Sequence, residues 1–465
     1  MKRKTIKEPA VTKLFWLPIY KVVIGIIKDV MVNMWVTCVD FVAARKKFLW
    51  VVVFPFLILV YPLLAITCVL AFLISFLITI GNYIVGGVVY VLDTVYLKLK
   101  SIRLSCPVCQ NKYTVPAYVC PKCGAVHNAL RPGRYGLFHR TCSCGERLPS
   151  TCFTGRHKLD YKCPHCGKLN SGNSLTHEIS IPVIGGADSG KTCYINMSIN
   201  QLEKVAPKYD LEFKFENVNS SNDYEQNISL LEKGLLPEKT GDIRMSYYQF
   251  YLTEKGAKVK NLVSLCDVKG ELFSNAHGVS EQVGFKNAKQ FLLILDPLSV
   301  QDFKEKIAAE RDVSKSSGSV MNMDEVLNAV IDTLEAYSAK SKKRSFKYDV
   351  AVVINKCDIP EVSDEIGRKA IDAALNNGSL ALKTELDAIN YVCENFLKKY
   401  NENNFLQQLK SKFNTVQFFV SSALGRDADN TNKKFEPINV EDAVLWLVDR
   451  ESSKINLKEK WHKTV

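Results

Sequence analysis

Negative charge is scarce in the first 176 residues, which hold 23 lysines and arginines but 6 aspartates and glutamates. The rest of the 465-residue chain holds 38 basic and 42 acidic residues, so the net charge of +13 arises in the N-terminal part. Such a basic segment favours anionic lipid headgroups or nucleic acid as neighbours. We interpret it as positive charge that flanks membrane segments on the cytoplasmic side.

Charge is scarcer still in residues 48–97, an apolar run whose one charged member is Asp93. Because one membrane-spanning helix needs about 20 apolar residues, the run predicts a transmembrane hairpin of two helices. No polar loop marks the turn, which halving the run places near residues 68–76. Basic residues flank both ends, at 45–47 and at Lys98, Lys100 and Arg103. The positive-inside rule therefore predicts a multi-pass protein, in the inner membrane if bacterial, with both ends in the cytoplasm.

A secretory signal peptide is excluded, because the run is too long, begins far from Met1 and has no small-residue cleavage site. A single span that leaves the N-terminus outside is the alternative topology. Residues 1–47 mix apolar positions with lysines, which predicts an amphipathic helix at the membrane interface. A packed core helix is the alternative for that segment.

Nine of the fifteen cysteines lie between Cys106 and Cys166, and eight of them form closely spaced pairs. The length of the chain excludes a small secreted disulfide scaffold, so the pairs indicate metal binding in a reducing compartment. We predict two zinc ribbons, at residues 98–128 and 129–176. The first would bind zinc through Cys106, Cys109, Cys120 and Cys123.

The second ribbon would bind zinc through Cys142, Cys144, Cys163 and Cys166, and the nearby residues that could replace a ligand are Cys152, His139, His157 and His165. Neither site has an open coordination position or a glutamate placed as a base. Both zinc sites are therefore predicted to be structural rather than catalytic.

From residue 177 onward, short apolar runs alternate with helical patterns. This predicts an α/β domain with a mostly parallel sheet at residues 177–450, followed by a polar tail at 451–465. Strands are expected at 179–185, 248–252, 262–267, 291–296, 349–355 and 416–422. Helices are expected at 191–204, 301–310, 323–338, 364–376, 382–400 and 440–449.

The first of these strands leads into a loop of the form GxxxxGK[ST], from Gly185 to Thr192, and then into a helix. Such a P-loop surrounds a β-phosphate with backbone N–H groups at the positive end of a helix. Lys191 would neutralise β- and γ-phosphate oxygens, and the Thr192 hydroxyl would bind Mg²⁺. The other residues predicted to line this part of the site are Asp188, Ser189, Gly190 and Cys193.

Three later motifs, DVKG at 267–270, NKCD at 355–358 and SAL at 422–424, each follow an apolar strand. From residue 179 to about 450 the chain thus resembles the translation-factor and Ras-like (TRAFAC) class of P-loop GTPases. The resemblance implies that Asp267 acts on Mg²⁺, Gly270 senses the γ-phosphate and Asp358 selects guanine. It also implies that the guanine pocket is completed by Asn355, Lys356, Ser422, Ala423 and Leu424, with the Ala423 N–H donated to guanine O6.

The resemblance further implies GTP hydrolysis, with Lys191, Thr240, Gly270 and Glu271 as candidate catalytic residues. Thr240 is the best candidate for the threonine that closes on Mg²⁺ and the γ-phosphate, although it could equally be a loop or capping residue. Glu271 stands where many relatives place a water-orienting glutamine. It would orient water itself, or a partner would complete the site. An exposed glutamate with no catalytic role is the alternative.

The motifs LRPGRYG (130–136), CSCGERLP (142–149) and GLLPEKT (234–240) also resemble bacterial membrane-anchored zinc-ribbon GTPases of paired-GTPase conflict and defence systems. We therefore predict a membrane-anchored switch that uses GTP/GDP, Mg²⁺ and two Zn²⁺. It would act through a protein effector or activating partner. A homodimer that forms through the GTPase domain is a further possibility. The alternative is an adaptor whose ribbons bind protein or, less favoured, nucleic acid, with the nucleotide as a structural ligand. A membrane-remodelling GTPase ranks last, because no long helical stalk is evident.

Overall fold

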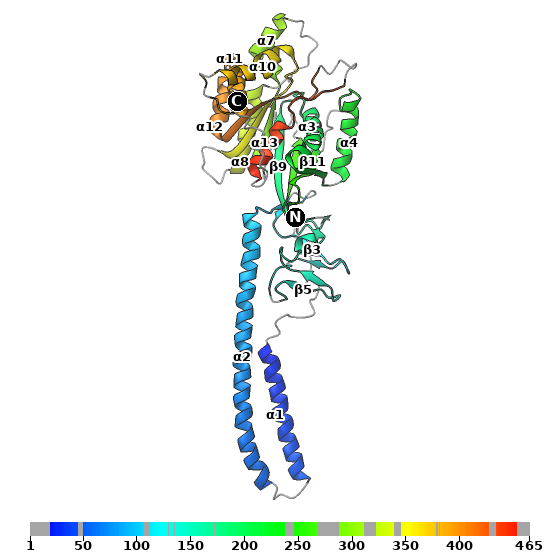
Figure 1. Cartoon of the computed structure of the whole chain (residues 1–465), viewed down its shortest axis with the longest axis vertical. Helices are drawn as coiled ribbons and strands as arrows, with labels where there is room; N and C mark the ends of the chain where they lie inside the picture. The colour runs from blue at the N-terminus through cyan, green and yellow to red at the C-terminus, as the bar shows by residue number, and fades with distance from the viewer. Residues whose placement is uncertain are drawn as a thin grey trace. The chain divides into compact units, whose positions relative to one another are not determined.

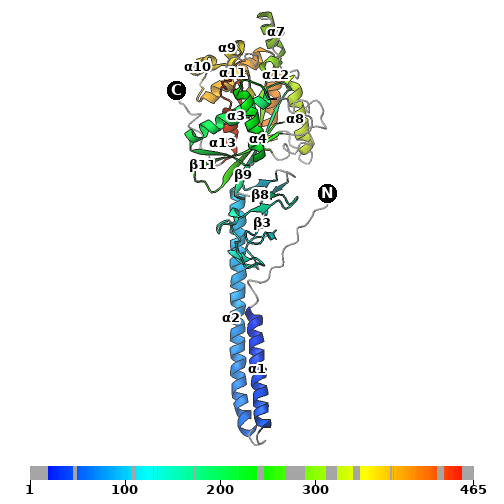
Figure 2. The same cartoon turned by 90° about the vertical axis from the view of Figure 1, so that its right-hand side faces the viewer.

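The chain divides into two compact units, Met1–Thr176 and His177–Val465, in the computed structural model (Figures 1 and 2). The structure describes residues 19–44, 50–106, 111–128, 130–133, 135–170, 173–216, 218–237, 246–267, 288–310, 322–338, 346–377, 380, 382–426 and 434–452. Each unit has a hydrophobic core of its own, and each is described separately below.

The apolar run of the first unit folds as one continuous helix, α2 (Trp50–Leu99), so the predicted hairpin with a turn near residues 68–76 is wrong (Figure 1). No glycine or proline lies between residues 63 and 80 to end the helix. The polar residues there do not interrupt it, since the Ser75 and Thr79 hydroxyls donate to the carbonyl oxygens of Ala71 and Ser75 within the same helix, at 2.7 Å each. These contacts leave the backbone hydrogen bonds of the helix in place.

Helix α1 (Ile19–Ala43) precedes α2 and packs against it (Figures 1 and 2). By length and composition, Val22–Phe41 of α1 and Ile58–Leu99 of α2 are each apolar enough to cross a membrane. The basic residues that were predicted to share one compartment now precede and follow a single helix. The multi-pass topology that rested on two spans within residues 48–97 therefore loses its basis.

The cysteine-rich part of the first unit, residues 102–176, is one interleaved module and not two consecutive ribbons. Its four-stranded sheet has the order β4-β3-β7-β8, so strands from both predicted ribbons share one sheet. Two separate pairs, β1 with β2 and β5 with β6, complete it. The strands of this cysteine module are β1 (Leu104–Ser105), β2 (Lys112–Tyr113), β3 (Ala117–Val119), β4 (Val126–His127), β5 (His139–Thr141), β6 (Arg147–Pro149), β7 (Tyr161–Lys162) and β8 (Leu169–Asn170).

Asp93, the one charge in the apolar run, joins α2 to the cysteine module. One carboxylate oxygen lies 2.9 Å from Nη2 of the fully buried Arg156, and the other accepts the backbone N–H of Cys152 at 2.9 Å. Arg156 also donates to the carbonyl oxygens of Leu130 and Ser150, at 2.9 and 2.7 Å. These additional hydrogen bonds offset part of the desolvation cost of a buried ion pair. The C-terminal end of α2 is thereby fixed in the module.

The second unit is built on a seven-stranded sheet of order β10-β11-β12-β9-β13-β14-β15. Strands β9, β13, β14 and β15 are parallel neighbours, whereas β11 is antiparallel to both β10 and β12. The predicted α/β sheet with mostly parallel strands is confirmed. Its strands are β9 (Thr176–Gly185), β10 (Leu211–Phe215), β11 (Ser246–Glu254), β12 (Lys260–Asp267), β13 (Gln290–Leu295), β14 (Phe346–Ile354) and β15 (Phe413–Val420).

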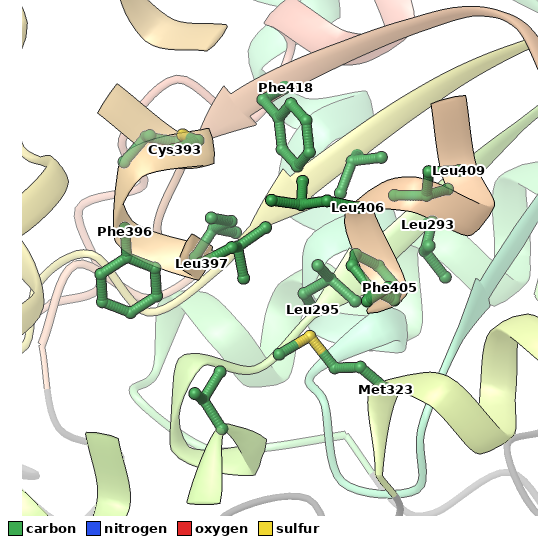
Figure 3. Close-up of a cluster of buried hydrophobic side chains, with 14 of the residues drawn as sticks. Leu293, Leu295, Met323, Cys393, Phe396, Leu397, Phe405, Leu406, Leu409 and Phe418 are labelled. Atoms are coloured by element: carbon green, nitrogen blue, oxygen red, sulfur yellow. The ribbon is translucent and has the colours of Figure 1, made fainter. Parts of the chain in front are cut away.

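Successive residues of a strand point to opposite sides of the sheet. The strands here are apolar at successive positions, so both faces of the sheet are covered by helices. In β13, Leu293 and Leu295 belong to the core formed with α7 to α12, and Leu292 and Ile294 to the core formed with α3, α4 and α13. Figure 3 shows the first of these cores. The helices are α3 (Lys191–Val205), α4 (Val218–Glu232), α7 (Gln301–Glu310), α8 (Met323–Ser338), α9 (Pro360–Ile366), α10 (Arg368–Asn376), α11 (Glu385–Lys399), α12 (Asn403–Lys412) and α13 (Asp442–Glu451).

The substitution Arg156→Met is expected to destabilise the cysteine module by about 3–5 kcal/mol, because it leaves the Asp93 carboxylate buried without a cation. Hydrogen exchange of the β3 and β7 amides in the full chain, in detergent, measures the free energy of opening. Arg147→Met is the matched control, since Arg147 is exposed on β6, and a change within about 0.5 kcal/mol is expected. Equal protection in the two variants would contradict a supporting role for the ion pair.

Candidate functional site

The loop between β9 and α3 is shaped by close approaches that only glycine permits. A Cβ atom on Gly185 would lie 2.7 Å from the carbonyl oxygen of Ile294, and one on Gly190 would lie 3.0 Å from Nδ2 of Asn355. Gly190 also has a φ of +82°, in the left-handed region, and Asp188 has a φ of +58°. These residues turn the chain from the end of β9 directly into the first residue of α3, Lys191.

The amine of Lys191 lies inside this loop. Its Nζ donates to the carbonyl oxygens of Gly185 and Gly186, at 3.1 and 2.7 Å, and the residue is 9% exposed. The loop therefore closes around one cation at the N-terminus of a 15-residue helix. A positive charge and the helix dipole at the same point are the components of an anion site.

Thr192 and Asp267 place two oxygens together beside this loop. The Thr192 hydroxyl donates to the Asp267 carboxylate at 2.8 Å, although the two residues come from α3 and the end of β12. Burial raises the pKa of Asp267, and the nearby charge of Lys191 acts in the opposite direction. A buried carboxylate beside a hydroxyl is the kind of oxygen pair that binds Mg²⁺.

Asn355 connects the glycine-rich loop to the segment after β15. Its Nδ2 donates to the carbonyl oxygen of Ser189 at 3.3 Å, and its Oδ1 accepts the backbone N–H of Ala423 at 3.1 Å. The resemblance assigned this same N–H to guanine O6. Donation to guanine through Ala423 would therefore have to replace the contact with Asn355.

Asp358 lies in the same group, where its carboxylate accepts a hydrogen bond from the Ser422 hydroxyl. Ser422 in turn accepts the backbone N–H of Gly425 at 2.8 Å. The NKCD and SAL motifs, separated by more than 60 residues in sequence, are thus in direct contact. Leu424 packs against the neighbouring hydrophobic core.

Asp296, which was not predicted as a site residue, contacts the NKCD motif through Lys356. Its fully buried carboxylate lies 2.7 Å from Nζ of Lys356 and accepts the backbone N–H of Leu298 at 3.0 Å. Lys356 itself has a φ of +60°, a backbone conformation that is costly for a residue with a side chain. The signal in the sequence was an aspartate at the carboxyl end of an apolar strand, FLLILD.

Three predicted catalytic residues, Thr240, Gly270 and Glu271, lie outside the described residues. Cys193 is half-buried on α3, where burial and the Asp267 carboxylate raise the pKa of its thiol to about 11. The predicted residues that the structure does describe at the nucleotide site come together at the carboxyl edge of the parallel strands.

Residues 179–409 match the Double-GTPase 2 family. The matched segment lies wholly within the second unit. No curated protein matches the chain. The predicted resemblance to P-loop GTPases of paired-GTPase conflict systems is confirmed, and it is consistent with the TRAFAC class.

The Double-GTPase 2 match begins in β9 and ends in α12, so it includes the glycine-rich loop, Asp267, Asp296 and the NKCD motif. Ser422, Ala423 and Leu424 follow the matched segment. Their contacts with Asn355 and Asp358 place them in the same site as the Double-GTPase 2 motifs.

The paired cysteines of the first unit form two groups, and each group combines cysteines from both of the predicted ribbons. The sulfur atoms of Cys120, Cys123, Cys142 and Cys144 all lie within 4.8 Å of one another, with Sγ separations of 3.7 Å (Cys120 to Cys144) and 3.6 Å (Cys123 to Cys142). A tetrahedral zinc with metal–sulfur distances near 2.3 Å has sulfur–sulfur edges of about 3.8 Å. Four thiol groups at these separations fit such an ion.

The second group contains Cys106, Cys163 and Cys166, with 3.4 Å between the sulfur atoms of Cys106 and Cys166. Cys109 lies outside the described residues. The predicted sets, which paired neighbours in sequence, are therefore wrong. Spacing in the sequence shows which two cysteines form a close pair. Strand pairing decides which two of these pairs meet to form one group.

The residues that could have replaced a zinc ligand are not members of either group among the described residues. Cys152 lies instead against Arg156 and Asp93, and its burial, with the Asp93 carboxylate nearby, raises the pKa of the thiol to about 11. A thiol that stays protonated is a poor metal ligand. His139 and His165 are exposed, and His157 Nδ1 lies 3.2 Å from the carbonyl oxygen of Cys152.

The substitution Asp296→Asn is expected to weaken GTP binding about tenfold, the effect of losing one charge-assisted contact of about 1.5 kcal/mol behind Lys356. Titration of the full chain with GTP measures the loss, and Asp364→Asn, an exposed acid of α9, should leave affinity unchanged. Thermal unfolding of both variants accompanies the titration. Unchanged GTP affinity, or a loss explained by unfolding, would contradict this positioning role.

Two paired substitutions distinguish the observed from the sequential cysteine grouping through the zinc content of the purified chain. Cys120→Ser with Cys142→Ser removes two ligands of one group and should lower zinc by one ion per chain. Cys120→Ser with Cys106→Ser removes one ligand from each group and should weaken the binding of both zinc ions. Sequential ribbons predict the opposite pattern for the two pairs, so that result in metal analysis would exclude the interleaved arrangement.

Proposed function

We propose that the protein is a GTP-dependent switch at the cytoplasmic face of a membrane and that it hydrolyses GTP to GDP. The Double-GTPase 2 match supports the activity class. The observation that carries the proposal is the direct contact between the NKCD and SAL motifs, at the same edge of the sheet as Lys191 and the Thr192–Asp267 pair. In this proposal, the phosphate-binding and base-binding elements lie side by side.

Each residue has a role in this proposal. Lys191 and the N-terminus of α3 bind β- and γ-phosphate oxygens, and the Asp358 carboxylate accepts from the N1–H and exocyclic amine of guanine. Adenine does not present that pair of donors. Thr192 and Asp267 would hold Mg²⁺, which neutralises charge that develops on the phosphates. Thr240 and Gly270 would respond to the γ-phosphate, and Glu271 would orient the attacking water.

Helix α2 would anchor the chain in the bilayer, because most of its large apolar side chains from Ile58 onward are exposed. The two cysteine groups would hold structural zinc, since all of their donors are thiols and no carboxylate base belongs to either group among the described residues. Output would occur by contact with a protein effector, as the loops around Thr240 and Gly270 change order with nucleotide state.

Titration of the full chain in detergent with GTP and ATP, in the presence of Mg²⁺, tests the nucleotide assignment. Wild-type protein should prefer GTP. Asp358→Asn should lose at least about 100-fold in GTP affinity, because guanine donors lose the carboxylate that pairs with them. Lys191→Ala should weaken GTP and GDP alike.

Binding without base preference, or no binding, would instead favour the adaptor in which nucleotide is only a structural ligand. Single-turnover hydrolysis in the same preparations tests the remaining roles. Unchanged hydrolysis by Glu271→Ala would remove that residue from the mechanism without affecting the nucleotide assignment.

A further inference from the structure

Residues 434–440, between β15 and α13, form a bracing segment that lies along the SAL motif. Phe435 and Val440, near its two ends, are buried in the core formed with α3, α4 and α13. Because both residues are held in this core, the bracing segment is fixed to the body of the second unit. Between them, it meets the SAL motif through its backbone.

Backbone hydrogen bonds join the bracing segment to the motif at two positions. Ser422 and Ile438 each donate a backbone N–H to the other's carbonyl oxygen, at 3.0 and 2.8 Å, as an antiparallel pair does. Two residues along the motif, the carbonyl oxygen of Leu424 accepts the backbone N–H of Glu436 at 2.9 Å. The residues on both sides of Ala423 are therefore bonded to the bracing segment.

Ala423 itself directs its backbone N–H away from the bracing segment. In an antiparallel pair, successive residues of one strand point their N–H groups to opposite edges, so the pairing of Ser422 determines the direction of the next N–H. That N–H donates to Oδ1 of Asn355 at 3.1 Å. The bracing segment thus sets the direction of the backbone group that guanine recognition would require from this motif.

Gly425 allows the motif and the bracing segment to approach this closely. Its φ is +69°, and a Cβ atom there would lie 1.9 Å from the carbonyl oxygen and 2.8 Å from the carbonyl carbon of Glu436. Since both of these neighbours are backbone atoms, a side chain at this position must displace the bracing segment. One residue further, the guanidinium of Arg426 lies over the ring of Phe435, 4.1 Å from its centroid, and adds a cation–π contact to the pairing.

We infer that Gly425 and the bracing segment position the Ala423 N–H for donation to guanine O6. This inference rests on the guanine pocket proposed above and adds the residues that hold the pocket at O6. Gly425 acts through Ala423 and is a positioning residue. Asp358 would bind the N1–H and the exocyclic amine of guanine from a different segment, the one that follows β14. Displacement of the bracing segment should therefore weaken recognition of O6 more than recognition of the amine.

The test measures the affinity of the full chain, in detergent with Mg²⁺, for GTP, for 6-thio-GTP, in which sulfur replaces O6, and for ITP, which lacks the exocyclic amine. Wild-type protein should prefer GTP to both analogues. Gly425→Ala should lower GTP affinity about tenfold, the effect of losing one hydrogen bond, and should bring the affinities for GTP and 6-thio-GTP close together. The ratio of GTP to ITP affinity should change by less than about twofold, the limit expected for an independent contact.

Gly256→Ala is the matched control. Gly256 also has a positive φ, +76°, in the turn between β11 and β12, but a Cβ atom there would meet nothing within 4 Å. The control has the same backbone cost without the close approach, so both affinity ratios should keep their wild-type values. Phe435→Leu is a second variant, which keeps an apolar residue in the core but removes the ring that Arg426 contacts. It should lower the ratio of GTP to 6-thio-GTP affinity in the same direction as Gly425→Ala.

A wild-type ratio of GTP to 6-thio-GTP affinity in both Gly425→Ala and Phe435→Leu would overturn the positioning role and leave the guanine pocket intact. An equal fall of both ratios in Gly425→Ala would also overturn it, because the whole base pocket would then have been lost. If thermal unfolding shows that Gly425→Ala does not fold, Phe435→Leu decides alone. Equal affinity of the wild-type protein for GTP and ATP would instead overturn the proposed guanine pocket, and this inference with it.

Discussion

Burial of four parallel strands on both faces is the constraint on which the nucleotide site depends. Leu292 to Leu295 alternate between two cores, so a shift of one residue in β13 would exchange the side chains of both. The register is fixed for this reason, and Ile294 pairs with Gly185, Leu295 with Ile354 and Ile354 with Val420. The loops that follow these strands consequently begin at the same edge. Packing remote from the site thereby determines which motifs meet.

Asn355 turns this shared edge into one connected structure. One side chain bonds both the glycine-rich loop and the Ala423 amide, while Lys191 bonds the loop from inside. Each of these contacts occupies a group that a bound nucleotide would also use. In the proposed function, nucleotide binding would exchange these internal hydrogen bonds for bonds to phosphate and base, and it would change how the loops are held. Such an exchange is what a switch requires.

The sequence was most informative where chemistry and chain order coincide. The glycine-rich loop, the NKCD motif and the six predicted strands each depend on a few consecutive residues, and the strands all coincide with strands in the structure. Strand β10 and helices α4 and α12 were missed because their patterns are weak. The predicted cysteine grouping was wrong for a different reason. Contacts between cysteine pairs that are distant in sequence depend on the pairing of β3 with β7. Asp296 could have been found, because a charge at the end of a buried strand needs a partner.

The error in the membrane segment has a physical explanation. Halving an apolar run treats every residue in it as lipid-facing, but the run contains one carboxylate, and a charge in hydrocarbon is costly unless it is paired. Asp93 is paired, yet its partner is 63 residues away in the cysteine module. The single charge therefore marks the point at which α2 packs against the cysteine module. The excess length belongs to the end of α2 that packs into the cysteine module.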